Sequence, residues 1–183
     1  MYKRQPQGGQ QQQYPSDSRI EQSVERPSTR YRTVNGGNAF RIAVPENWRQ
    51  FGDNSSITFA PQGAYGNYQG QSVFTHGAIV GIANIQSRNL QQATDQYINS
   101  LLQSNSYLQP RGNYRRSNLG QRNGLTVTLA GRSPVTQRNE IVNVHTALLS
   151  NGQLFYVINV VPNEDYREYQ QVFTNMLRSI ELG

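Results

Sequence analysis

Residues 154–161 read LFYVINVV, a run that is apolar on both faces apart from Asn159. A strand of this kind is typical of the centre of a sheet whose two faces are both covered. Asn151-Gly152 stands one residue before the run, and an Asn-Gly pair between two apolar stretches predicts a tight hairpin with residues 141–149. The run therefore predicts a central strand with an antiparallel neighbour.

Two more strands are predicted directly upstream. Residues 125–129 alternate apolar and polar side chains, which is the period of a half-buried strand. Residues 122–124 read RNG and predict a second hairpin turn before them, and residues 114–120 predict a weaker strand before that turn. Residues 131–139 are polar and predict the connection to the strand over 141–149.

The N-terminal half of the chain predicts three strands and one loop. Residues 40–44 alternate large apolar side chains with smaller or polar ones, and we predict that they form a hairpin with a second strand over 56–60. Residues 61–71 hold three glycines, two tyrosines and no aliphatic side chain larger than alanine, which predicts a surface loop. Residues 78–85 predict the third strand.

Two segments have the period of an amphipathic helix. Apolar residues between Leu90 and Leu102 recur every three or four positions, and Asn89 or Ser87 can cap the start of this helix. A second helix is predicted over residues 164–182. Because antiparallel hairpins combine with two helices, we predict an α+β fold, with a mostly antiparallel sheet and a helix on each face.

The first part of the chain differs in composition from the rest. Residues 1–38 are rich in Gln, Pro, Gly, Ser and Arg, and they bury too little apolar surface to offset the entropy lost on ordering. We therefore predict a disordered linker over 1–38 and a single α/β domain over 39–183. The basic start lacks the apolar stretch of a signal peptide, and no run approaches the ~20 apolar residues of a transmembrane helix. Because the chain begins with such a segment, we expect Met1 to mark a fragment boundary.

The charge distribution is informative about partners. The formal net charge is +6, and residues 1–38 carry half of the excess. In the predicted domain eleven arginines stand against eight acidic residues, and Arg115-Arg116 is the only adjacent basic pair. Domains that bind nucleic acid usually concentrate positive charge on one face. We therefore expect no nucleic-acid partner.

The sequence holds few residues that carry chemistry. It has no cysteine and two histidines, His76 and His145. Zinc sites of the HExxH type need two histidines one helical turn apart, and serine hydrolases need a nucleophile with a base and an orienting acid. Neither pattern is present, and an isolated histidine is more often a surface or hydrogen-bonded core residue. The sequence therefore predicts no catalytic residue, no metal site and no cofactor in this chain.

Five side chains are candidates for a binding role, namely Tyr65, Tyr68, His76, Arg115 and Arg116. The two tyrosines lie among glycines, a composition that suits an adaptable contact surface and also an ordinary mobile loop. The two arginines lie next to a tyrosine, a mixture that can stack on a ligand and also one that protects the exposed edge of a sheet. The histidine lies at the junction between a loop and a strand.

Three stretches carry a resemblance to known proteins. Residues 37–48 read GNAFRIAVPENW, residues 59–66 read FAPQGAYG, and residues 75–77 read THG. The strand-Pro-x-x-Trp opening, followed by a hairpin and two helices, resembles the PsbP-like α/β/α sandwich. More closely, the three stretches resemble the C-terminal region of bacterial zinc metalloproteases related to the CAAX prenyl proteases. The similarity covers nearly all of residues 28–183.

This resemblance implies a non-catalytic accessory domain. The zinc and the catalytic residues of that family lie in an upstream HExxH domain, and no residue of this chain matches them. The resemblance also implies a protein partner or a covalently linked protease domain, and a location in the bacterial cell envelope or periplasm through the parent protein. A stand-alone partner-binding or ligand-binding protein is an alternative, and a small hydrolase that uses His76 or His145 is a third.

Overall fold

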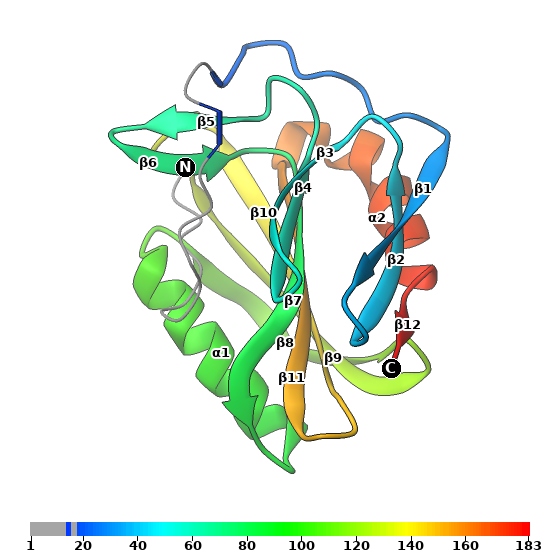
Figure 1. The fold of residues 1–183 in the computed structure, drawn as a ribbon. Coiled ribbons are helices and arrows are strands. Elements are labelled where there is room, and N and C mark those ends of the chain that lie inside the picture. Colours follow the sequence, from blue (N-terminus) through cyan, green and yellow to red (C-terminus); the bar gives the residue numbers. More distant parts are fainter. Residues whose placement is uncertain (1–13, 16–17) are drawn as a thin grey trace.

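The computed structural model describes residues 14–15 and 18–183. These residues form two α-helices and one short 3-10 helix around a large sheet (Figure 1). The helices are α1 (Leu90–Ser104), η1 (Asn163–Asp165) and α2 (Tyr166–Arg178). The strands are β1 (Tyr31–Gly36), β2 (Phe40–Pro45), β3 (Arg49–Asp53), β4 (Ser56–Ala60), β5 (Tyr65–Tyr68), β6 (Gln71–Phe74), β7 (Gly77–Gln86), β8 (Gln109–Leu119), β9 (Arg122–Arg132), β10 (Asn139–Leu148), β11 (Gln153–Pro162) and β12 (Glu181–Leu182).

The large sheet is entirely antiparallel. Its strands follow the order β3-β4-β7-β11-β10-β9-β8, so the LFYVINVV strand lies at the centre, as predicted. A smaller antiparallel sheet has the order β1-β2-β12, and β5 pairs with β6. The prediction of an α+β fold with a mostly antiparallel sheet is confirmed.

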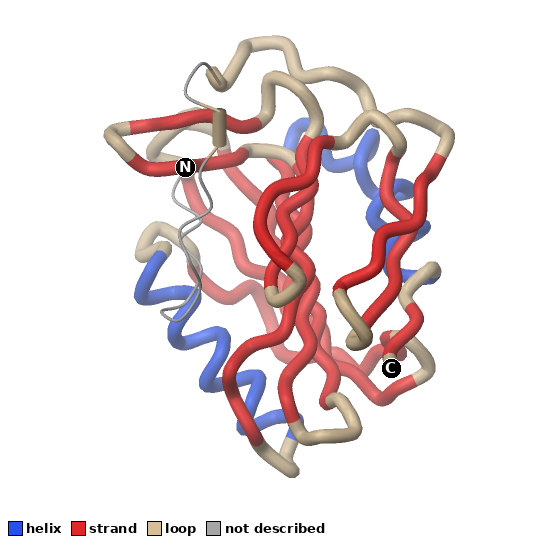
Figure 2. The backbone as a smooth tube through the Cα atoms, viewed as in Figure 1, coloured by secondary structure: helices blue, strands red, loops and turns tan. Residues whose placement is uncertain are grey.

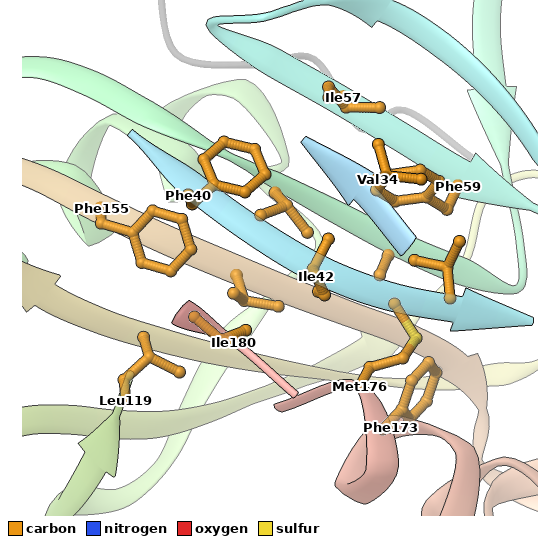
Figure 3. Close-up of a cluster of buried hydrophobic side chains, with 14 of the residues drawn as sticks. Val34, Phe40, Ile42, Ile57, Phe59, Leu119, Phe155, Phe173, Met176 and Ile180 are labelled. Carbon is orange, nitrogen blue, oxygen red and sulfur yellow. The ribbon is translucent and has the colours of Figure 1, made fainter. Parts of the chain in front are cut away.

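Alternate residues of β11 belong to two clusters of buried side chains. Leu154, Tyr156 and Ile158 pack with the buried side of α1, whereas Phe155 and Val157 pack with that of α2. Successive strand residues point to opposite faces of a sheet, so the two clusters lie on opposite sides of it. We call them the α1-side core and the α2-side core. Figure 2 shows the two helices and the sheet between them, and Figure 3 shows the α2-side core.

The domain begins earlier than the sequence predicted. β1 lies inside the segment predicted as a linker, and it pairs with β2 from Tyr31 opposite Pro45 to Gly36 opposite Phe40. Val34 is buried in the α2-side core, so this strand contributes apolar burial despite its polar neighbours. The boundary predicted at residue 39 was therefore wrong. The disorder predicted for residues 1–13 and 16–17 falls outside the described residues.

The predicted hairpin between residues 40–44 and 56–60 is not formed. Instead β4 pairs with β3 and β7, and β2 pairs with β1 and β12. The turn between β3 and β4 is closed by Asp53, whose Oδ1 accepts hydrogen bonds from the backbone nitrogen and the hydroxyl of Ser55 at 2.8 and 2.5 Å. The sequence prediction missed β3 because only Phe51 among its five residues is a large apolar side chain.

Two turns also differ from the predictions. The segment over 61–71 was predicted as a loop, but it holds the start of a hairpin, β5–β6, which turns at Gln69-Gly70. The turn between β8 and β9 lies at Gly120-Gln121, whereas Asn123 and Gly124 are part of β9. Both turns place two successive residues at positive φ, with values from 50° to 76°, as tight hairpins require.

Helix α1 follows the predicted apolar stripe, and its N-cap is one of the two candidates. The Asn89 side chain accepts a hydrogen bond from the backbone nitrogen of Gln92 at 3.0 Å. We expect Asn89→Ala to lower the free energy of unfolding by about 1 kcal/mol, because an N–H of the first turn loses its acceptor. Urea unfolding would measure the change. Asn99→Ala, on the exposed side of the same helix, is the control and should leave stability nearly unchanged.

Helix α2 is shorter than the predicted range of 164–182. It ends at Arg178 because the next residues join the small sheet, where Ser179 Oγ accepts a hydrogen bond from the Ala43 backbone nitrogen and β12 pairs with β2. Among the described residues, no helix has the length and apolar character needed to cross a bilayer. The C-terminal strand therefore fixes α2 against the rest of the domain.

Candidate functional site

One half of the large sheet presents a polar surface to solvent on the α2 side. Residues opposite one another on neighbouring strands share a face, and here they form two rows. One row runs from Arg115 on β8 through Thr126 on β9 to His145 on β10, and the other runs from Arg111 through Thr128 to Asn143 on the same three strands. We define the open sheet face as both rows together with Ser117, that is, Arg111, Arg115, Ser117, Thr126, Thr128, Asn143 and His145.

The location of this face follows from the alternation along β9 and β10. His145 lies two residues before Ala147, which belongs to the α2-side core, so it points to the same side of the sheet. The intervening residues of these strands point the other way, and Val127 and Val144 are buried beneath α1. Helix α2 packs against β2 and β11. Of the two polar rows only Thr126 is buried, with 7% of its surface exposed, and the other residues are half-buried or exposed. The sheet is therefore apolar on one side and polar on the other at this end.

Short hydrogen bonds order the floor of the face. Thr128 Oγ1 donates to Asn143 Oδ1 at 2.7 Å, and Thr126 Oγ1 lies 2.8 Å from His145 Nδ1. Asn159 of β11 donates from Nδ2 to His145 Nε2 at 3.3 Å, which leaves the proton of the neutral ring on Nδ1. The Asn159 Oδ1 atom is buried without a hydrogen-bond partner in the described part of the chain. The floor thus presents oriented hydroxyl and amide groups.

The imidazole of His145 is neutral at physiological pH. Burial, and to a lesser extent the positive charge of Arg115, lowers the pKa of His145 to about 4. The positive charge of the face therefore comes from its arginines. Arg111 and Arg115 are exposed and form no ion pair within residues 14–15 and 18–183. The face combines two free cationic groups with a floor of fixed dipoles.

His76 lies elsewhere, in a buried hydrogen-bond network at the start of β7. Its Nε2 donates to Asp165 Oδ2 at 2.9 Å, and Thr75 Oγ1 lies 2.8 Å from its Nδ1. Arg138 also donates to the Asp165 carboxylate, at 3.0 Å. Burial lowers the pKa of His76, and Asp165 partly offsets this shift. Because only 4% of His76 is exposed and both ring nitrogens are hydrogen-bonded, the network connects β7 to η1 and the start of α2.

Solved structures with a similar fold come from several kinds of organism. The Ran-binding protein Mog1p of Saccharomyces cerevisiae aligns with a TM-score of 0.56 at 12% identity, over 85% of this chain and 96% of that chain. Cyanobacterial PsbP (CyanoP) from Synechocystis sp. PCC 6803 aligns with a TM-score of 0.53 at 9% identity, over 84% and 92% of the two chains. The fold is PsbP-like.

The third similar structure is LpqN, a protein involved in cell envelope biogenesis of Mycobacterium tuberculosis. Its TM-score is 0.50 at 11% identity, and the match covers 84% of this chain and 90% of LpqN. No protein-family model matches the sequence, and no curated protein matches it either. These likenesses confirm the predicted PsbP-like fold, and the predicted relation to metalloproteases stays a prediction.

The five predicted binding residues do not form one site on this PsbP-like fold. Arg115 lies on the open sheet face, whereas Arg116 is exposed on the opposite face, opposite Leu125. Tyr65 is buried in the α1-side core, and the half-buried Tyr68 directs its hydroxyl toward the Pro134 carbonyl at 3.5 Å. The predicted tyrosine surface is therefore largely internal, because β5 and β6 fold back onto the domain as a hairpin.

The sequence analysis missed most of the open sheet face. Thr126, Thr128, Asn143 and His145 were predicted to lie on strands, but their shared side of the sheet went unnoticed. A signal was available, since both strands place polar residues at every second position. Within the described residues no group of three or more His, Cys, Asp or Glu side chains is arranged to hold a metal ion.

Proposed function

We propose that this chain is a non-catalytic protein-binding domain and that its open sheet face binds an acidic segment of a partner protein. The observation that carries the proposal is the pair of exposed arginines beside a floor of hydroxyl and amide groups. Arg111 and Arg115 offer guanidinium donors that match carboxylates in geometry. The half-buried Thr128 and Asn143 add a hydroxyl and an amide that can hydrogen-bond to a peptide backbone.

The two histidines support a binding role over catalysis. A general base needs a ring nitrogen that can reach the proton it abstracts. Both nitrogens of His76 and both nitrogens of His145 are already engaged with protein groups. In addition, a pKa of about 4 makes His145 a weak base at neutral pH. We therefore propose a binding domain without a cofactor of its own, in place of the small hydrolase.

The rest of the described surface supports a polar mode of binding. No large hydrophobic side chain of the described residues is exposed. A partner would therefore contact this surface mainly through polar groups. Among proteins with this fold, Mog1p is a Ran-binding protein, and we take this as support for a protein partner. We further propose, on the sequence resemblance, that the domain serves a zinc metalloprotease of the bacterial envelope. The zinc would then be bound by the protease and not by this domain.

The proposal is testable by reversing the charge of the two arginines. We expect Arg111→Glu/Arg115→Glu to weaken binding of an acidic partner at least about tenfold, because two charge-assisted hydrogen bonds become repulsive contacts. The first probe is a peptide of alternating Glu and Ser residues, titrated into isotopically labelled protein. The NMR shifts of Arg115, Thr126 and Asn143 should respond, and added salt should reduce the response.

The matched control is Arg88→Glu/Arg116→Glu, which makes the same charge change at two exposed positions away from the face. Partner capture from cell extract should then separate the variants. Proteins retained by the wild type and by the control, but lost from Arg111→Glu/Arg115→Glu, support the proposal. If both double variants lose or keep the same proteins, the open sheet face is not the binding surface.

A further inference from the structure

The N-terminal segment, residues 14–15 and 18–26, lies against β5 and the residues just before it. Tyr14 is buried there, with 8% of its surface exposed, and its ring lies 4.6 Å from Phe51 and 5.4 Å from Tyr65, measured between centroids. The Phe51 and Tyr65 rings are themselves in edge-to-face contact at 4.6 Å. The three rings therefore pack mutually, with Tyr14 supplied from outside the sheet. Figure 1 shows this segment, in blue, crossing above β5 and β6 toward β1.

Two glycines let the backbone of this segment come close to the hairpin. A Cβ atom on Gly66 would lie 2.9 Å from the Ile20 nitrogen, and one on Gly63 would lie 2.9 Å from the Ser23 carbonyl oxygen. Backbone hydrogen bonds hold the segment close to these glycines. Glu21 donates to the Gly63 carbonyl at 2.8 Å, and Glu25 donates to that of Gln62 at 3.0 Å. Gly63 and Gly66 thus form the floor of a narrow track.

The segment is anchored at both ends, by the Tyr14 ring at one end and by hydrogen bonds to Asn47 at the other. At the far end Asn47 accepts a hydrogen bond from the Ser28 nitrogen at 2.8 Å and donates to the Arg26 carbonyl at 2.9 Å. Between the anchors Ile20 and Val24 are half-buried, and the charged side chains are exposed. Main-chain hydrogen bonds to a peptide, together with a pocket that takes an anchoring side chain, are a recurring mode of peptide recognition.

We propose that Phe51, Tyr65, Gly63 and Gly66 form a peptide-binding groove, the tyrosine groove, for an extended segment with a tyrosine anchor. The described residues 14–15 and 18–26 of the same chain are its intramolecular ligand. An equivalent peptide in trans competes with them for the same groove. This site lies on the β5–β6 side of the domain and is separate from the open sheet face, so the two proposals stand or fall independently.

The test uses the full-length chain and a fluorescein-labelled peptide with the sequence of residues 12–26. Tyr14→Ala empties the aromatic pocket and leaves the groove intact. Tyr14→Ala/Gly66→Ala also blocks the track, and Gly66→Ala is otherwise mild, since the three closest atoms to its Cβ belong to Arg19 and Ile20 and its φ is not positive. A peptide carrying alanine in place of Tyr14 is the ligand control. Circular dichroism checks that each variant is folded.

We expect the peptide to bind Tyr14→Ala at least about tenfold more tightly than the wild type. A tethered segment has an effective concentration on the order of 1 mM, which outcompetes a free peptide with an affinity of about 100 μM. The double variant and the control peptide should each reduce binding at least about tenfold. Equal binding to wild type and Tyr14→Ala would overturn the intramolecular assignment, and absence of binding to a folded Tyr14→Ala would overturn the groove.

Exchange between two copies is the remaining alternative. If the segment of one molecule filled the groove of another, the wild type would dimerise with rising concentration and Tyr14→Ala would stay monomeric. Light scattering over a range of protein concentrations distinguishes the cases. A monomeric wild type supports the intramolecular ligand, and a Tyr14-dependent dimer contradicts it.

Discussion

Gly77→Ala is expected to lower the free energy of unfolding by about 4 kcal/mol. Gly77 opens β7 with a φ of 141°, and an added Cβ would lie 2.1 Å from the carbonyl oxygen of Phe59. Phe59 pairs next to this position across the β4–β7 ladder, so its carbonyl cannot withdraw without breaking the sheet. Backbone strain at such a position costs about 1–3 kcal/mol, and overpacking adds a similar amount.

Urea unfolding followed by tryptophan fluorescence would measure this loss, because Trp48 is buried in the α2-side core. Gly70→Ala is the matched control. Gly70 also has a positive φ, of 76°, but its Cβ would meet no atom within 4 Å, so only the backbone cost of about 1 kcal/mol remains. If the two variants lost the same stability, the close approach of β4 to β7 would not be what requires glycine at residue 77.

Gly77 also illustrates what the sequence could not predict. Its neighbour His76 was predicted to stand at a loop-to-strand junction, but the need for glycine at residue 77 comes from Phe59, which lies 18 positions earlier in the chain. By contrast, β11 and α1 were predicted correctly because their signals are local. β11 is apolar from Leu154 to Val161 apart from Asn159, and α1 has a continuous apolar stripe with Asn89 before it. Local patterns therefore specified elements, and long-range contacts specified their pairing.

The open sheet face depended on a register that the sequence analysis assigned wrongly. A turn at Asn123-Gly124 would have paired Thr126 with Gln121. The turn at Gly120-Gln121 pairs Thr126 with Arg115 and so brings the arginine next to His145. Asn-Gly is the stronger turn signal, but the longer strand pairing formed by the other turn buries Leu119 and Val127. The burial of apolar side chains therefore sets the register between β8 and β9, and this register determines which residues lie together on the open sheet face.

The N-terminal segment was misjudged for a related reason. Composition predicted no order before residue 39, and a glutamine-rich sequence cannot form a core of its own. Tyr14 and Val34 are nevertheless buried, because each packs into a core formed mainly by later residues. Tyr14 packs into the α1-side core and Val34 into the α2-side core. The composition of a segment indicates whether the segment can form a core by itself. It does not indicate whether the segment can pack against a surface formed by the rest of the chain.

Acid is expected to destabilise the domain through His145, by about 2 kcal/mol between pH 6.5 and pH 4. The folded protein lowers the pKa of His145 to about 4 from the ordinary value of 6.5. Between these values the unfolded chain binds a proton that the folded chain excludes, so the free energy of unfolding falls as pH falls. This contribution is fully present above pH 6.5. The full pKa shift corresponds to about 3 kcal/mol of stability. Solvent reaches part of the His145 ring and screens its charge, so the expected loss is smaller.

His145→Gln isolates this contribution, because glutamine can still hydrogen-bond to Thr126 and Asn159 but does not titrate. We expect urea unfolding at pH 7.5 and pH 4.5 to show a wild-type loss that exceeds the variant's loss by about 1–2 kcal/mol. His76, whose pKa is also lowered, is present in both proteins and cancels in this comparison. Equal losses would mean that the ring is open to solvent in the folded protein. A difference of the expected size means that His145 is neutral in the folded protein at physiological pH, so that the positive charge of the open sheet face comes from its arginines.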